Sequence, residues 1–109
     1  MVNAARDRGA RHERPAIDEA ALAAARRADR LLAAAQEREI ARWEAFLAPL
    51  PDRLRDDPLP DLRRTALRAR AAYGPKDSIR DALPAELTEP FLESIDRLIR
   101  ELNRRDVAG

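Results

Sequence analysis

Residues 88–105 read TEPFLESIDRLIRELNRR, and this stretch decides the fold. Its apolar side chains recur every three or four residues, which is the period of one helix face and not of a strand. They are Phe91, Leu92, Ile95, Leu98, Ile99 and Leu102. Thr88 can cap the first turn, and Pro90 lies where a missing N–H costs nothing. We therefore predict an amphipathic helix over residues 88–105.

A longer helix is predicted upstream, over residues 16–48. Pro15 suits its first turn, and Pro49 cannot continue it. At ~1.5 Å per residue it would span about 50 Å. Its second half carries a bulky face that we expect to pack on the 88–105 helix, formed by Ile40, Trp43, Phe46 and Leu47. Its first half is lined mostly by alanine, which gains little apolar burial.

A short helix is predicted over residues 61–73, starting at Asp61 and ending at Gly74, which we expect to adopt the left-handed conformation. Its apolar positions are Leu62, Ala66, Ala69 and Tyr73. Its outer face carries only basic charge after Asp61, from Arg63, Arg64, Arg68 and Arg70. Residues 49–61 hold repeated Pro-Asp steps and are predicted to be a stiff connector with at most one helical turn.

These elements predict an all-α protein with a single domain over residues 16–109. The domain is a small bundle of one long helix, one short arginine-faced helix and a C-terminal amphipathic helix. Residues 1–15 have no apolar period and several arginines, so we predict a flexible basic tail. Residues 78–81 resemble a capping box that starts at Ser78, which predicts one further helical turn before Pro84.

The composition excludes several kinds of chemistry. The chain has 109 residues, no cysteine and a single histidine, His12, in the predicted tail. Disulfides, cysteine-ligated zinc and histidine-based catalysis therefore have no residues to use. No hydroxyl side chain has a base to activate it, and the glycines form no phosphate-binding loop. We predict no enzyme activity, no cofactor, no metal and no small-molecule substrate.

Charge and hydropathy also limit the partners. The 21 basic and 20 acidic residues leave a net charge of +1, so no global field attracts nucleic acid or an anionic membrane. The longest apolar run, residues 20–25, is too short to span a bilayer, and no signal region opens the chain. We therefore expect a cytoplasmic protein that does not enter membranes.

A mismatch of helix lengths carries the functional prediction. The 88–105 helix would be about 27 Å long and cannot cover the whole 16–48 helix, which would be about 50 Å long. The alanine-rich half of the 16–48 helix is therefore predicted to meet a partner. The predicted interface consists of Leu22, Ala25, Ala28, Leu32 and Ala35. Its occupant would be a second copy in an antiparallel coiled-coil pairing or a different protein, and the alternative is a protruding helix whose alanine-leucine face stays in solvent. The leading hypothesis is a non-catalytic protein–protein interaction module, acting as an adaptor, a regulatory subunit or an antitoxin-like partner.

The alternative is a small nucleic-acid-binding regulator. It would use the arginine face of the short helix, whose members Arg63, Arg64, Arg68 and Arg70 could meet phosphates. However, residues 77–96 are mostly acidic, so the basic helix could instead face an acidic one within the fold. A steep salt dependence of binding would distinguish phosphate contacts from apolar helix pairing.

One stretch loosely resembles a known family. Leu83 and Pro84 precede an amphipathic helix that contains Ile95, Asp96 and Leu98, as in the first half of ribbon-helix-helix repressors. The resemblance would imply DNA binding through a short strand. Residues 84–90 begin and end with proline and leave no clear strand for this role, so the family is not assigned.

Overall fold

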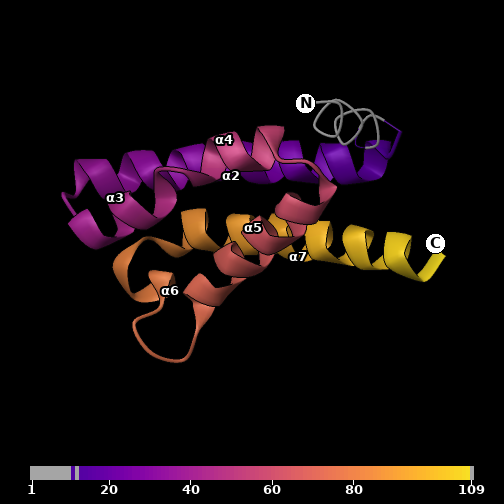
Figure 1. Ribbon diagram of the computed structural model, residues 1–109. Helices are drawn as coiled ribbons and strands as arrows, with labels where there is room; N and C mark the ends of the chain where they lie inside the picture. The colour runs from indigo at the N-terminus through magenta and orange to yellow at the C-terminus, as the bar shows by residue number, and fades with distance from the viewer. Residues whose placement is uncertain (1–10, 12, 109) are drawn as a thin grey trace.

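The computed structural model describes residues 11 and 13–108, and this part of the chain consists of helices joined by short turns, without strands (Figure 1). The helices are α2 (Pro15–Glu37), α3 (Ala41–Leu47), α4 (Leu50–Asp56), α5 (Leu59–Arg70), the 3-10 turn η1 (Ala71–Tyr73), α6 (Ile79–Ala82) and α7 (Ala85–Ala108). The predicted all-α class is confirmed. No helix in the described ranges is both long and apolar enough to cross a bilayer.

The predicted long helix over residues 16–48 is wrong, because α2 ends at Glu37. The Ile40 N–H donates to the Ala35 carbonyl at 3.0 Å, and Glu39 between them adopts a left-handed conformation with φ of 54°. This is the hydrogen-bonding pattern of a Schellman turn, which ends a helix and reverses the chain. No proline or glycine marks the position. No signal in the sequence therefore predicts that the helix ends at this point with Glu39 in the left-handed conformation.

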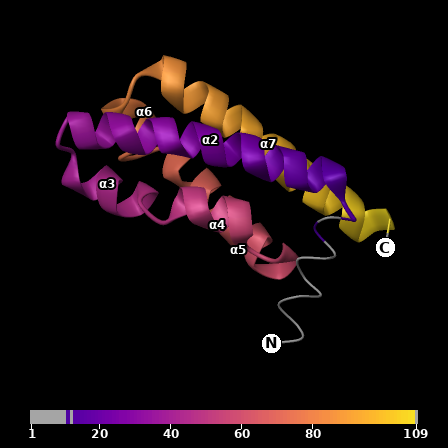
Figure 2. The same cartoon turned by 90° about the horizontal axis from the view of Figure 1, so that it is seen from above.

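The reversal places α2 in the middle of the bundle. Figure 2 shows α7 on one side of α2 and the α3–α4 segment on the other, both running antiparallel to it. α4 occupies most of the predicted connector over residues 49–61, and its Leu50 and Leu54 are fully buried. α5 then packs on α4 and α7 and closes the bundle. The connector is thus a structural layer of the core.

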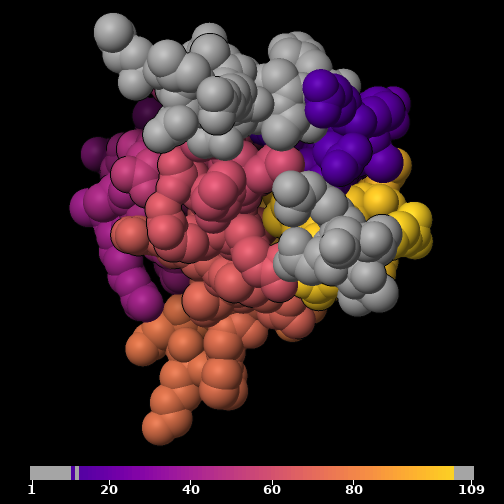
Figure 3. All heavy atoms as spheres, turned by 45° about the vertical axis from the view of Figure 1, so that its right-hand side comes forward, coloured from indigo at the N-terminus to yellow at the C-terminus, as the bar shows by residue number. Residues whose placement is uncertain are grey.

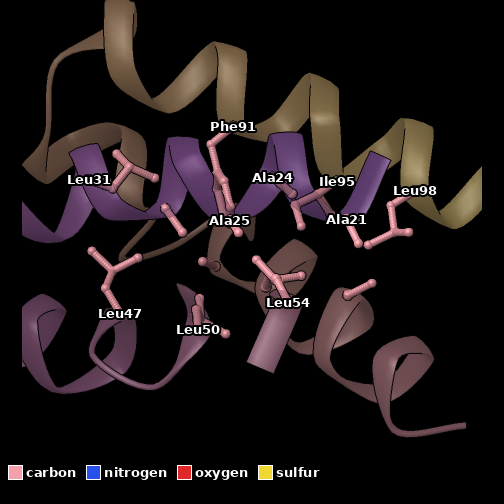
Figure 4. Close-up of a cluster of buried hydrophobic side chains, with 14 of the residues drawn as sticks. Ala21, Ala24, Ala25, Leu31, Leu47, Leu50, Leu54, Phe91, Ile95 and Leu98 are labelled. Atoms are coloured by element: carbon pink, nitrogen blue, oxygen red, sulfur yellow. The ribbon is translucent and has the colours of Figure 1, made fainter. Parts of the chain in front are cut away.

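Alanines form the centre of the core. Ala21, Ala24 and Ala25 on α2 are completely buried between leucines of α3 and α4 and the apolar face of α7 (Figure 4). Small side chains allow helix axes to approach closely on two sides at once. The surrounding large side chains include Leu31, Leu47, Leu50, Leu54, Phe91, Ile95 and Leu98.

The predicted partner interface on α2 is therefore largely internal. Ala25, Ala28 and Ala35 are completely buried within the chain, and Leu32 is half-buried against the same core. Only Leu22 is exposed, at 36%. The prediction that this face is open to a partner is wrong, because α3 and α4 fold back and cover the residues that a continuous helix would have exposed.

α7 carries the predicted amphipathic face. Phe91, Ile95, Leu98 and Leu102 are buried, while Leu92 and Ile99 are partly buried at the edges of the face. The helix begins at Ala85, before the predicted start at Thr88, so Pro90 lies inside it. Thr88 is completely buried rather than a cap, and its carbonyl accepts a 2.5 Å hydrogen bond from the Tyr73 hydroxyl.

The chain after α5 also departs from the prediction. The helix passes into η1, and Gly74 follows in an extended conformation with φ of −67°, not in the left-handed region. Residues 74–77 project from the body of the molecule (Figure 3), and Asp77 takes the left-handed conformation with φ of 52°. Ser78 caps α6 as predicted, because its Oγ accepts the Arg80 N–H at 3.1 Å.

Most of the predicted flexible tail, residues 1–15, lies outside the described residues. Arg11 is described and is only 4% exposed. Its guanidinium donates to Asp18 and to the backbone carbonyls of Leu54 and Asp57, at 2.8–3.1 Å. The prediction of flexibility is therefore wrong for Arg11, because these hydrogen bonds fix it against α2 and the α4–α5 junction.

Candidate functional site

The arginine face predicted on the short helix is divided between two sides of α5. Arg63 and Arg70 lie on the side of α7, where Arg63 donates to Asn103 at 2.7 Å and Arg70 pairs with Asp96 at 2.9 Å. The second contact is an internal pairing of a basic helix with an acidic one. These two arginines are thus engaged within the fold.

The other two arginines lie on the opposite side, towards α3 and α4. Arg64 forms an ion pair with Asp61 one turn earlier on the same helix. Arg68 places its guanidinium 5.9 Å from the centre of the Phe46 ring and has no carboxylate partner in the part of the chain that the structure describes. Arg68 therefore keeps an uncompensated charge beside an aromatic side chain.

A groove lies between α3 and the end of α5. It encloses about 480 Å³ and is walled by α3 on one side and by α5, η1 and the following loop on the other. Its apolar lining is Trp43, Ala45, Phe46, Ala71 and Ala72. Its charged lining is Arg42, Arg68, Lys76 and Asp77. We call this the α3–α5 groove.

Trp43 forms the inner wall of the α3–α5 groove. Its ring meets that of Phe46 edge to face, with centroids 5.5 Å apart and an interplanar angle of 82°, and the Arg42 guanidinium lies 4.8 Å from it. Trp43 is 6% exposed, so its predicted burial is confirmed. The predicted packing of Trp43 on the last helix is wrong, because α3 packs mainly on α2 and α4.

The charges of the groove are unbalanced. Arg42, Arg68 and Lys76 are exposed and have no carboxylate partner among the described residues, and Asp77 is the single acidic residue of the lining. Arg42 and Arg68 each lie over an aromatic ring, which positions a cation without neutralising it. The groove is therefore an apolar surface bordered by net positive charge.

A second hollow adjoins the groove and shares Arg68 with it. It encloses about 410 Å³ between α4 and α5. Its polar groups largely satisfy one another, because Thr65 donates to Asp57 at 2.6 Å and Arg64 pairs with Asp61. This hollow lacks an apolar wall, and its two carboxylates oppose an anionic ligand.

The acidic side chains of the described residues form no metal site. No group of three or more histidine, cysteine, aspartate or glutamate side chains there could hold a metal ion. Burial, assisted by the charge of Glu89, raises the pKa of Tyr73 above its ordinary value, so its hydroxyl stays protonated and donates to the Thr88 carbonyl. Tyr73 is thus a structural donor. His12 lies outside the described residues.

Sequence reasoning missed most of the groove. Arg42, Lys76 and the two alanines of η1 belong to three separate segments, and only the reversal at Glu39 brings α3 next to them. Among the four arginines of the predicted arginine face, only Arg68 lines the α3–α5 groove. Comparison with known proteins gives no further indication, as no protein family, curated protein or solved structure shows significant similarity to the chain.

Proposed function

We propose that the chain is a non-catalytic protein–protein interaction module, in which the α3–α5 groove binds an acidic amphipathic segment of a partner protein. The module would act as an adaptor, a regulatory subunit or an antitoxin-like partner. The proposed compartment is the cytoplasm.

The observation that supports the proposal is the combination of an apolar wall with unpaired cations. Phe46 is half-exposed, and Ala71 gives a small, open surface opposite it. An amphipathic helix can place apolar side chains in such a groove and carboxylates at its rim. Arg42, Arg68 and Lys76 would meet these carboxylates and set the orientation of the partner.

The same features favour a protein over nucleic acid. Single-stranded nucleic acid is bound by stacking of bases on exposed aromatic faces, whereas Trp43 is 6% exposed and the Arg42 guanidinium lies over its ring. Arg63 and Arg70, which the nucleic-acid hypothesis required, are engaged with α7. Nucleic acid remains the competing outcome of the experiment below.

Trp43 provides a reporter for the test, because it is the only tryptophan and it lines the groove. An acidic helical peptide with leucines on one face should change its fluorescence in a saturable way. The same peptide with the leucines replaced by serine, and a single-stranded oligonucleotide of equal charge, should bind at least about tenfold more weakly.

A pair of charge reversals locates the site. Arg68→Glu, in the groove, should weaken peptide binding by about tenfold or more, whereas Arg38→Glu, exposed beyond the end of α2, should not. If the oligonucleotide bound more tightly than the peptide, the nucleic-acid alternative would be favoured. If neither ligand bound, or if both variants lost binding equally, the proposed groove would be ruled out.

A further inference from the structure

A small pocket lies on another face of the molecule, in the seam between α2 and α7. It encloses about 160 Å³. Ala20 and Ala23 of α2 line it, and their short side chains leave space between the two helices. Three arginines line it from two helices, Arg27 on α2 and Arg97 and Arg100 on α7. Neither the predicted interface nor the α3–α5 groove includes these residues.

The three arginines carry uncompensated charge. Arg27 is half-buried and donates one N–H to the Pro90 carbonyl at 2.9 Å, which fixes the guanidinium without neutralising it. Arg97 and Arg100 form no hydrogen bond or ion pair with any residue that the structure describes. Glu93 also lines the pocket, but it is not within ion-pair distance of Arg27, Arg97 or Arg100.

We propose that this pocket binds a phosphate group carrying two negative charges. Three guanidinium charges against one carboxylate leave two positive charges, which a phosphate dianion would balance. Guanidinium groups present parallel N–H donors that match the oxygens of phosphate. The fixed Arg27 preorganises one of these donors, and the exposed guanidiniums of Arg97 and Arg100 can contact the ligand from the α7 side.

The pocket suits one phosphate group and not a nucleic-acid backbone. Its arginines surround a single hollow instead of following a groove, and Glu93 would oppose a second phosphate at its edge. The group could be inorganic phosphate or the phosphate monoester of a modified side chain on a peptide. Both sources offer the same tetrahedral dianion.

Two-dimensional NMR of the full chain tests the site. Ser94 of α7 also lines the pocket. Titration with inorganic phosphate, and separately with a phosphoserine peptide, should shift the Arg27 side-chain and Ser94 amide signals in a saturable way. The unphosphorylated peptide should leave them unchanged. Tighter binding of the phosphopeptide would assign the group to a modified partner, and equal binding would assign it to the free anion.

Matched variants separate a site from general attraction. Arg97→Gln with Arg100→Gln removes two exposed side chains of the pocket and should weaken binding on the order of a hundredfold, because charge-assisted hydrogen bonds are lost. Arg26→Gln with Arg30→Gln removes the same charge from exposed positions of α2 outside the pocket lining and should preserve binding. Loss in both variants, or no saturable shift in the unmodified protein, would overturn the proposal.

Discussion

At the scale of single residues, arginines that pair with distant segments hold the helices together. Arg11 joins the start of the described chain to the α4–α5 junction, and Arg27 joins α2 to α7 through the Pro90 carbonyl. Arg80 joins α6 to α7 through two hydrogen bonds to Glu89, at 2.8 and 2.9 Å. Such contacts depend on the final geometry, so helical periodicity could not predict them.

Arg11→Ala is expected to lower the free energy of unfolding by about 2–3 kcal/mol, because a buried guanidinium with a carboxylate and two carbonyl partners is lost. Urea unfolding would measure the change. Arg14→Ala, at an exposed position nearby, is the control and should change stability by less than about 0.5 kcal/mol. Equal stability of both variants would show that Arg11 is not fixed in solution.

Glu89→Gln should make stability less dependent on pH. The hydrogen bond from Arg80 is the largest influence on Glu89 and lowers its pKa in the folded state, with a smaller contribution from Thr88. The folded protein therefore gains stability from Glu89 above the ordinary glutamate pKa of about 4.3 and loses it as the pH falls through the lower folded value.

The difference in unfolding free energy between the unmodified protein and Glu89→Gln should thus be present at neutral pH and disappear in acid, once the pH lies below the lowered folded pKa of Glu89. Urea unfolding at both pH values measures it. Arg80→Gln removes the donor and should show the same pattern. A difference that persists unchanged at low pH would show that the pairing is not responsible.

At the scale of elements, periodicity predicted the presence of helices better than their ends. The apolar face of α7 was clear, because its large side chains follow the helical period without interruption. The turn at Glu39 was hidden, because its sequence has neither proline nor glycine and its left-handed conformation is unusual for glutamate. Treating residues 16–48 as one helix then misplaced α3 and the partner surface.

Glu39→Gly should raise the free energy of unfolding by roughly 0.5 kcal/mol, because glycine adopts the left-handed conformation without the steric cost that glutamate incurs. Chemical denaturation would measure it. Gln36→Gly, within the exposed last turn of α2, should instead lower stability by about 1 kcal/mol. If both substitutions destabilised the protein equally, residues 36–39 would belong to a continuous helix.

At the scale of the whole molecule, the alanine face of α2 serves as the central layer of the core. Alanine buries little area per residue, which led the sequence reasoning to place this face outside. The structure uses its small size differently, since it lets α7 and the α3–α4 segment approach α2 from both sides. We therefore assign the candidate partner surface to the α3–α5 groove and no longer to the alanine face of α2.

Introducing a charge into this layer tests the central claim most directly. Ala28 is completely buried, so Ala28→Glu should lower the free energy of unfolding by at least about 3 kcal/mol, because it buries an unpaired carboxylate. Ala33→Glu, exposed on the same helix, should change it by less than about 0.5 kcal/mol.

Urea unfolding followed by Trp43 fluorescence, with light scattering on the same samples, shows whether the alanine face of α2 is buried within the chain or lies at the surface of an assembly. The account predicts that Ala28→Glu loses its cooperative unfolding transition or shifts it strongly, while Ala33→Glu unfolds like the unmodified protein. An Ala28→Glu variant that kept its stability and changed only its oligomeric mass would contradict the account, and would return the alanine face of α2 to the surface of an assembly.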